Sequence, residues 1–279
     1  MVKSTLMNWM SSVKALMTNV RAFLIFIALY ALLLVSFYYF ISTREATVWQ
    51  VSVTYALLFL VPAEFFVLQA TIIAFARGHE FLAKQIIADA IKLFVVTIPI
   101  IIVGAFVWWL MNKLQARFPA APAPIVFAPT PPKPQPIHWP TLLITTLRFV
   151  LFGVALPLAT IQLWIEATAR DVRASVAGGA KALLSRLSNA MARAFAPDSA
   201  FVYGLGLILF VLGPYLFLFV PLAVKGNKTD FAVFVVRLLL VFIFTLIGWV
   251  VTVATLARAN PNAEPVEIKA PAIVAESPA

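Results

Sequence analysis

The chain has no cysteine, only two histidines and few charged residues. Without cysteine, the sequence excludes disulfides, thiolate metal sites and a cysteine nucleophile. Charged residues make up 11% of the 279 positions and hydrophobic residues 63%, whereas soluble domains average about 25% and about 45–50%. A water-soluble fold cannot cover that much apolar surface. The sequence therefore predicts an all-α integral membrane protein.

Six apolar runs are long enough to be transmembrane helices, because about 20 helical residues cross roughly 30 Å of hydrocarbon. They lie at residues 22–41, 50–76, 93–112, 141–168, 201–224 and 231–257. An even number of spans places both termini on the same side of the membrane. The predicted fold class is a bundle of about six transmembrane helices with amphipathic interfacial helices on the cytoplasmic side.

The distribution of basic residues predicts the orientation. Lys and Arg are about twice as frequent in the N-terminal segment, the connections after spans two and four, and the start of the C-terminal tail as in the other connections. This bias predicts a multi-pass protein of a bacterial inner membrane with cytoplasmic N- and C-termini. The net charge of +10 then indicates contact with anionic lipid headgroups and not with nucleic acid.

Tryptophan prefers the membrane interface, where its ring is in lipid and its N–H is hydrated. Six tryptophans lie near predicted span ends or in the N-terminal segment. The predicted interface anchors are Trp9, Trp49, Trp108, Trp109, Trp139 and Trp164.

Two segments outside the spans have a helical hydrophobic period with basic residues beside the apolar face. They cover residues 1–21 and about 172–196. One interpretation is a helix lying in the headgroup layer; the alternative is that the apolar stripe of 1–21 packs on a helix of this chain or of a partner. The residues predicted to contact anionic lipid are Lys3, Lys14, Arg21, Arg173, Lys181, Arg186 and Arg193.

The connections between the predicted spans divide the sequence into regions. Residues 1–21 are the N-terminal amphipathic helix, 22–112 hold helices one to three, and 141–257 hold helices four to six. Residues 113–140 form a predicted extracytoplasmic loop that is rich in proline, either a semi-rigid spacer or a ligand for another protein. Residues 258–279 are predicted to be a flexible C-terminal tail.

Polar side chains inside hydrocarbon are costly and are the first candidates for function. Glu64 lies near the middle of span two, where a carboxylate must be neutralised, paired or hydrated. The functional interpretation is a proton or cation relay; the structural one is pairing or hydrogen bonding that fixes helix packing. The residues considered for either role are Glu64, Gln69, Arg148, Gln162, Glu166 and Arg237.

Prolines within spans free a backbone carbonyl and can kink a helix, a feature that transporters use. The predicted helix breaks are at Pro62, Pro99, Pro157, Pro214 and Pro221.

No catalytic motif, metal ligand set or cofactor site is predicted. Neither His79 nor His138 has a second histidine or carboxylates at metal-ligand spacing. The sequence has no His-Glu-x-x-His and no Gly-x-Ser-x-Gly.

Two short motifs end spans two and four, Ala74-Phe75-Ala76-Arg77-Gly78 and Ala167-Thr168-Ala169-Arg170-Asp171. With them the chain resembles a group of bacterial six-span proteins that includes the membrane domain of some glycerophosphodiester phosphodiesterases. The phosphodiesterase domain has no counterpart in this sequence, so the resemblance implies a membrane fold and no activity.

The functional hypothesis is a non-catalytic accessory or scaffold subunit of a larger membrane protein assembly, with membrane-protein subunits and lipids as partners. The alternative is a small-solute or lipid transporter that uses Glu64 and the proline-broken helices.

Overall fold

The computed structural model describes residues 2–44, 47–118, 138–169, 179–220 and 226–259. Every element in these ranges is helical, and six helices are long and apolar enough to cross a membrane. The predicted all-helical fold and the predicted number of spans are confirmed.

The spans are α2 (Val20–Ser42), α3 (Val48–Ala76), α4 (Ala83–Arg117), the α5–η1–α6 series, the α9–η2–α10 series and α11 (Asn227–Arg258). Two elements precede or separate them, α1 (Val2–Thr18) and α8 (Gly179–Ala194). The fourth span consists of α5 (Trp139–Arg148), η1 (Phe149–Ala155) and α6 (Leu156–Thr168), and the fifth of α9 (Pro197–Leu207), η2 (Ile208–Leu212) and α10 (Gly213–Phe219).

The predicted and observed boundaries differ most at α4. The sequence placed residues 77–92 outside the span, but the helix starts at Ala83. Residues 83–92 are mostly good helix formers, and Ala90 and Leu93 are buried on the face toward the core. Residues 83–92, which were predicted to belong to a connection, therefore extend the helix by nearly three turns.

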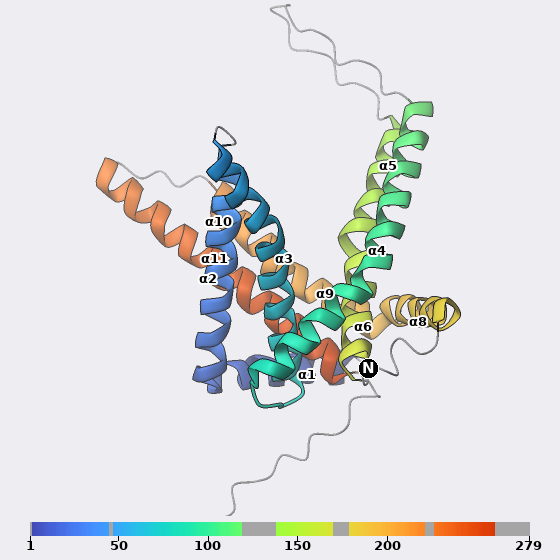
Figure 1. Cartoon of the computed structure of the whole chain (residues 1–279), viewed down its shortest axis with the longest axis horizontal. Coiled ribbons are helices and arrows are strands. Elements are labelled where there is room, and N and C mark those ends of the chain that lie inside the picture. The colour runs from blue at the N-terminus through green and yellow to red at the C-terminus, as the bar shows by residue number, and fades with distance from the viewer. Residues whose placement is uncertain (1, 45–46, 119–137, 170–178, 221–225, 260–279) are drawn as a thin grey trace, which may run out of the picture.

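Two of the predicted helix breaks lie just after π-helical turns. Pro157 is the second residue after η1, and Pro214 is the second residue after η2. Proline has no N–H and crowds the carbonyl one turn before it, so a widened turn ahead of it relieves the conflict. Pro62 and Pro99 instead lie inside continuous α-helix, although α4 changes direction along its length (Figure 1). Pro221 lies outside the described residues.

The core of the bundle lies toward one end, where α3, α6 and α11 finish and α2, α4 and α9 begin; we call it the closed end. Side chains from these helices and from α1 interlock there, including Phe26, whose ring meets Phe75 edge-on at 5.5 Å between centroids. Helix α1 lies across the closed end (Figure 1). It buries Thr5, Ser12 and Leu16 against the bundle.

The packing of α1 bears on the two interpretations of residues 1–21. One side of α1 contacts α2, α9 and α11 of the same chain, which is the predicted packing on a helix of this chain. Apolar side chains on its other side, including Met7 and Met10, are exposed. One side of α1 therefore packs on the bundle, and a second apolar surface remains uncovered by the described residues.

At the opposite, open end, α4 and α5 diverge from the remaining helices (Figure 1). We call residues 101–117 and 139–152 the arm. The two helical segments of the arm contact each other, and the Trp108 ring lies edge-on to the Phe152 ring at 5.6 Å between centroids. Its outward side chains are large, apolar and exposed, including Ile102, Phe106, Leu143 and Phe149.

Candidate functional site

Glu64 forms a link between two helices. It is buried in α3, and its Oε1 accepts a hydrogen bond of 3.0 Å from the Ser36 hydroxyl of α2. The other carboxylate oxygen, Oε2, is buried and has no hydrogen-bond partner among the described residues. Of the two environments considered for Glu64, an arginine pair and a hydrogen bond across helices, the structure contains the hydrogen bond.

Both intramembrane arginines have other partners, toward the open end. Arg148 donates to Asn112 Oδ1 at 2.6 Å, and its guanidinium lies 5.0 Å from the centre of the Trp108 ring. Arg237 donates to the carbonyl of Val220, next to the end of α10, at 2.7 Å. Arg148 thus joins the two helices of the arm, and Arg237 satisfies a carbonyl at a helix end.

The two predicted glutamines also join helices. Gln69 of α3 accepts a hydrogen bond from the indole N–H of Trp249 in α11, at 2.8 Å. Gln162 of α6 donates to the Ser199 hydroxyl of α9, at 3.2 Å. Glu166, near the end of α6, is buried. Together with Glu64, these residues connect α2 to α3, α3 to α11 and α6 to α9.

One of the six predicted interface tryptophans, Trp164, is a packing residue instead, whereas the interface stays a prediction for the partly exposed Trp9. Trp164 is 3% exposed, and its N–H donates to Thr97 Oγ1 of α4 at 2.7 Å. A neighbouring helix supplies the acceptor that water would supply at the interface. Trp9 is partly buried against the core, and its indole nitrogen is buried without a hydrogen-bond partner in the described ranges.

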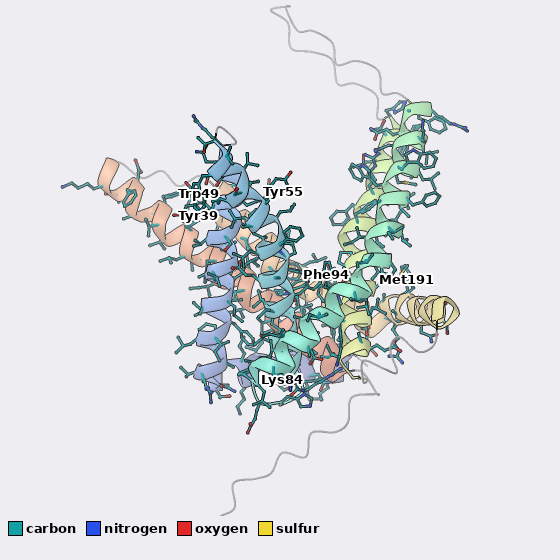
Figure 2. The ribbon with its side chains drawn as sticks, in the orientation of Figure 1. Tyr39, Trp49, Tyr55, Lys84, Phe94 and Met191 are labelled. Atoms are coloured by element: carbon teal, nitrogen blue, oxygen red, sulfur yellow. The ribbon has the colours of Figure 1, made fainter. Side chains whose placement is uncertain are left out.

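The other four predicted interface tryptophans have exposed side chains, as an interface position requires. Trp49, Trp108, Trp109 and Trp139 are all exposed. Figure 2 shows Trp49 and Tyr39 toward the open end and Lys84 near the closed end. Anchoring at a lipid interface stays a prediction for these four.

The residues predicted to contact anionic lipid differ in their exposure. Lys3, Lys14 and Arg21 are exposed at the closed end. Arg193, in the last turn of α8, is only partly exposed. Arg173 and the side chains of Lys181 and Arg186 lie outside the described residues.

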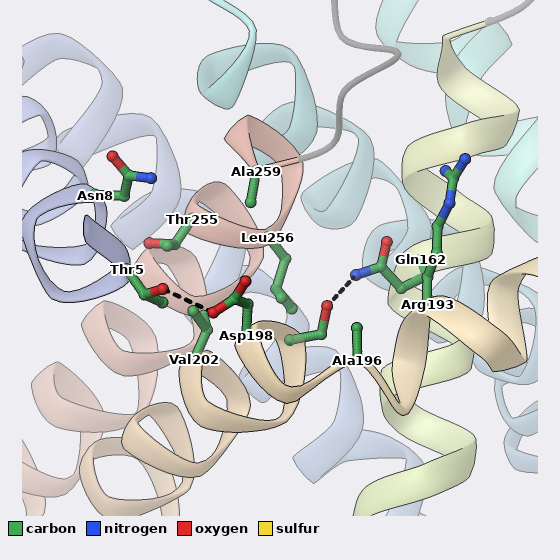
Figure 3. A pocket seen from close by; sticks show the side chains of 11 residues that line it. Thr5, Asn8, Gln162, Arg193, Ala196, Asp198, Val202, Thr255, Leu256 and Ala259 are labelled. Carbon is green, nitrogen blue, oxygen red and sulfur yellow. Dashed lines mark hydrogen bonds between the residues drawn. The ribbon is translucent and has the colours of Figure 1, made fainter. Parts of the chain in front are cut away.

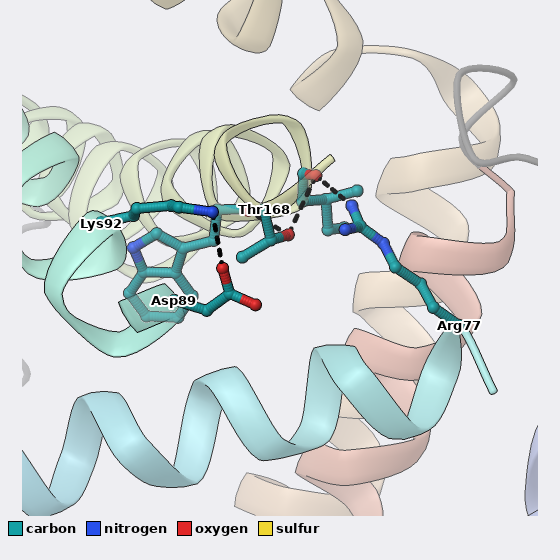
Figure 4. A network of polar contacts seen from close by, with 6 residues as sticks. Arg77, Asp89, Lys92 and Thr168 are labelled. Atoms are coloured by element: carbon teal, nitrogen blue, oxygen red, sulfur yellow. Dashed lines mark hydrogen bonds and ion pairs between the residues drawn. The ribbon is translucent and has the colours of Figure 1, made fainter. Parts of the chain in front are cut away.

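A group of polar contacts that the sequence did not predict lies at the closed end, where the residue after α3 bonds to α6 and an ion pair of α4 lies nearby (Figure 4). Arg77, the residue after α3, donates from Nη2 to the carbonyl of Ile165 in α6. Thr168 adds hydrogen bonds to the carbonyls of Trp164 and Ile165, at 2.9 and 3.2 Å. Asp89 in α4 forms an ion pair of 2.8 Å with Lys92.

Burial lowers the pKa of the Arg77 guanidinium, and the nearby Asp89 carboxylate partly offsets this by raising the pKa. An arginine remains charged at any physiological pH. Arg77 therefore places a fixed positive charge between α3 and α6, where its hydrogen bond to a backbone carbonyl compensates part of the cost of burial.

Arg258 is a second arginine in this role, at the end of α11. It donates to the carbonyl of Ala76 at 3.4 Å and to the Ser12 hydroxyl of α1 at 3.2 Å. It thereby connects α11 with the end of α3 and with α1. The only sequence signal was position, since both Arg77 and Arg258 directly follow or end an apolar span.

A cavity of about 390 Å³ opens at the closed end, between α1, α6, α8, α9 and α11. We call it the polar pocket (Figure 3). Thr5 donates to Asp198 Oδ1 at 3.1 Å on one side, and the Gln162–Ser199 hydrogen bond lies on the other. The lining residues are Thr5, Asn8, Gln162, Arg193, Ala196, Asp198, Ser199, Val202, Thr255, Leu256 and Ala259.

The polar pocket joins residues that are as much as 254 positions apart in the chain, from Thr5 to Ala259. Of its lining, only Gln162 and Arg193 were among the predicted functional residues. It offers one guanidinium, one carboxylate, hydroxyl groups and carboxamides around aliphatic side chains.

No family model, no curated protein and no solved structure matches the chain. The resemblance to six-span bacterial membrane proteins stays a prediction.

Proposed function

We propose that the protein is a non-catalytic accessory or scaffold subunit of a larger membrane assembly. The six candidate spans make it a multi-pass membrane protein. A bacterial inner membrane with both termini cytoplasmic is part of the proposal, and the bias in Lys and Arg supports it. The closed end then faces the cytoplasm, with Lys3, Lys14 and Arg21 of the N-terminal region directed to anionic lipid headgroups.

The observation that carries the proposal is that intramembrane polar side chains form hydrogen bonds between helices. Glu64, Gln69 and Gln162 each form a hydrogen bond to a different neighbouring helix. Such bonds fix which helices are neighbours and at which register. Hydrogen bonds between neighbouring helices make the bundle a frame, which is what a scaffold needs.

The arm supplies the surface for a partner. Ile102, Phe106 and Leu143 are exposed in this chain, and the Arg148–Asn112 hydrogen bond holds the two helices of the arm together. Aromatic side chains on a fixed backbone make good anchors, because they bury a large area at a low cost in side-chain entropy. A transmembrane helix of a partner subunit is the proposed occupant.

Purification from native membranes in mild detergent tests the proposal. We expect a second, different polypeptide at fixed stoichiometry, and a protein mass by light scattering above the 30.7 kDa of this chain. Truncation of anchor residues commonly costs about 2 kcal/mol or more, so a Phe106→Ala, Leu143→Ala variant should release the partner. The matched control, Leu24→Ala with Leu32→Ala, removes two exposed side chains of α2 and should keep it. A monodisperse 30.7 kDa protein, or equal partner loss in both variants, would contradict the proposal.

A transporter is the second candidate, and two observations favour it. Glu64 Oε2 is buried with no hydrogen-bond partner in the described part of the chain, which is the arrangement of a carboxyl group available to a proton or cation. The π-helical turns η1 and η2 add to this, since π-turns are frequent at functional sites.

Glu64→Gln separates the two candidates. In proteoliposomes, a transporter that relies on the carboxylate loses proton-coupled uptake, and its thermal stability changes little. A frame that uses Glu64 as a helix link shows a change in thermal stability and no flux that depends on residue 64.

A further inference from the structure

We propose that the arm is hinged at its base and that the hydroxyl of Tyr203 is a latch that sets the angle of the arm to the closed end. The base is the stretch in which α4 and the fourth span leave the remaining helices (Figure 1). The inference concerns the position of the arm, so it is independent of the scaffold role and of what the arm contacts.

Both helices of the arm have a proline and a glycine at this base. In α4 these are Pro99 and Gly104, and in the fourth span they are Gly153 and Pro157. Proline removes a backbone hydrogen bond from a helix, and glycine restricts the backbone least. Helices bend at such residues and at π-turns, and Gly153 lies inside the π-helical turn η1. Each helix of the arm therefore bends most easily at its base.

The points of weakness in the two helices lie at the same level. A Cβ added at Gly104 would lie 3.7 Å from Leu156 Cδ1, so Gly104 faces the residue that directly follows η1. Pro99 is little more than one turn away from Gly104 along α4, and Pro157 is next to Leu156. Two neighbouring helices that bend at one level can swing together and keep their contacts with each other.

The contacts on the two sides of the base join different parts of the molecule. Toward the closed end, the N–H of Trp164 in α6 donates to Thr97 Oγ1 of α4 at 2.7 Å, and both residues are buried. Toward the open end, the hydrogen bond from Arg148 to Asn112 joins the two helices of the arm to each other. The part of α4 before the base is thus tied to the closed end, and the arm beyond the base can move as one unit.

Tyr203 connects the closed end to the hinge. It lies in α9, is 3% exposed and belongs to the core of the closed end. Its hydroxyl donates to the carbonyl of Gly153 at 3.0 Å. In an α-helix this carbonyl would accept from the N–H four residues later, which is the position of Pro157, and proline has no N–H. The Tyr203 hydroxyl therefore replaces a missing backbone donor, and it favours the arm angle that keeps Gly153 within its reach.

Distance measurements between pairs of spin labels, on the full-length protein in lipid nanodiscs, test the hinge. The chain has no cysteine, so the labels attach only to introduced cysteines. Leu143→Cys with Phe59→Cys spans the hinge, and Leu143→Cys with Phe106→Cys lies within the arm; all three positions are exposed. The first pair reports the angle of the arm, and the second reports the shape of the arm itself.

Tyr203→Phe removes only the hydroxyl of the latch. Across the hinge, the population at distances other than the main one should rise about two- to tenfold, the change expected from the loss of one hydrogen bond. The distances within the arm should stay the same. Tyr38→Phe removes the hydroxyl of an exposed tyrosine of α2; it is the matched control and should change neither distribution. Thermal unfolding verifies that each variant is folded.

Two further changes act on the hinge itself. Pro157→Ala supplies an N–H for the Gly153 carbonyl, so the effect of Tyr203→Phe should largely disappear in its presence. Gly104→Ala with Gly153→Ala should narrow the distribution across the hinge, because alanine restricts the backbone. Both added Cβ atoms fit, since their nearest neighbours lie at 3.7 and 3.5 Å.

The outcomes distinguish a hinge from local unfolding. Broadening across the hinge with unchanged distances within the arm supports the inference. Wild-type distances in Tyr203→Phe overturn it, as does equal broadening for both label pairs. An undiminished effect of Tyr203→Phe beside Pro157→Ala also overturns the latch, because the hydroxyl would then act elsewhere than on the Gly153 carbonyl. No partner takes part in the measurement, so the hinge and the scaffold role can fail independently of each other.

Discussion

The closed end and the arm are both built from apolar helices but differ in what covers them. At the closed end, Ile165 of α6 is 0% exposed, whereas Ile102 in the arm is 63% exposed. Arg77 and Arg258 add hydrogen bonds to backbone carbonyls of neighbouring helices at the closed end. In the arm, the Arg148 side chain reaches only the other helix of the arm, at Asn112.

The difference shows what holds a membrane bundle together. Lipid tails are as apolar as leucine, so close packing and interhelical hydrogen bonds, not the exclusion of water, must join the helices. The closed end has both, and the arm has them only between its own two helices. The closed end is therefore a frame that this chain completes alone, and the arm is the part left for lipid or for a partner.

The largest expected effect compares one residue type in the two regions. Ile165→Ala should lower the free energy of unfolding by about 2–5 kcal/mol, because it leaves a cavity in a packed interior. Ile102→Ala should change it by about 0.5 kcal/mol or less. Denaturant unfolding of both variants in the same detergent measures this, and equal losses would show that the two regions are packed alike.

Arg77→Gln is expected to lower stability by about 1.5–3 kcal/mol, the contribution of a hydrogen bond from a charged group. The shorter, neutral side chain does not reach the Ile165 carbonyl. Lys84→Gln is the matched control, since Lys84 is an exposed cation near the closed end; it should stay within about 0.5 kcal/mol. The measurement is the midpoint of thermal unfolding in detergent. Identical midpoints for the two variants would show that Arg77 does not stabilise the closed end.

Glycines test the close approach of α11 to the fifth span. An added Cβ at Gly248 would lie 2.8 Å from Leu209 Cβ and 2.9 Å from the Phe210 backbone nitrogen, whereas none of the described atoms lies within 4 Å of a Cβ at Gly204. Gly248→Ala should cost about 1–3 kcal/mol through overpacking. Gly204→Ala should stabilise its helix by about 0.5–1 kcal/mol. Unfolding curves that shift in the same direction for both variants would contradict this packing.

The smallest expected effect is at the intramembrane carboxyl group. Ser36→Ala should lower stability by about 0.6 kcal/mol, the average contribution of an interhelical hydrogen bond in a membrane protein. Combined with Glu64→Gln in a double-mutant cycle, it should give a coupling energy of similar size. Zero coupling would mean that the Ser36–Glu64 hydrogen bond does not join α2 to α3 in the membrane.

The spans were predictable because a run of about 20 apolar residues is a local signal. The hydrogen-bond partner of Glu64 could not be predicted from the sequence. Ser36 faces Glu64 only because of how α2 is rotated relative to α3, and this rotation depends on how the helices pack. Trp164 was assigned to the interface for the same reason, since its acceptor Thr97 lies on a helix far away in the sequence.

The polar pocket and the closed-end arginines show a second limit. Arg77 was counted among the basic residues of a connection, and its bond to the Ile165 carbonyl depends on where α6 ends. Thr5, Asp198 and Thr255 are ordinary polar residues in the sequence, and only the meeting of α1, α9 and α11 makes them one cavity. Periodicity identifies helices, but it does not identify which of their ends meet.

Site-specific photocrosslinking in native membranes tests the division between frame and arm most directly. A photoreactive residue is placed at Ile102 in the arm or at Leu24 on α2 near the closed end, positions with similar exposure of 63% and 59%. The account predicts a discrete adduct with one other polypeptide from Ile102 and only lipid adducts from Leu24. Lipid adducts alone from both positions would contradict it, because the arm would then face nothing but the bilayer.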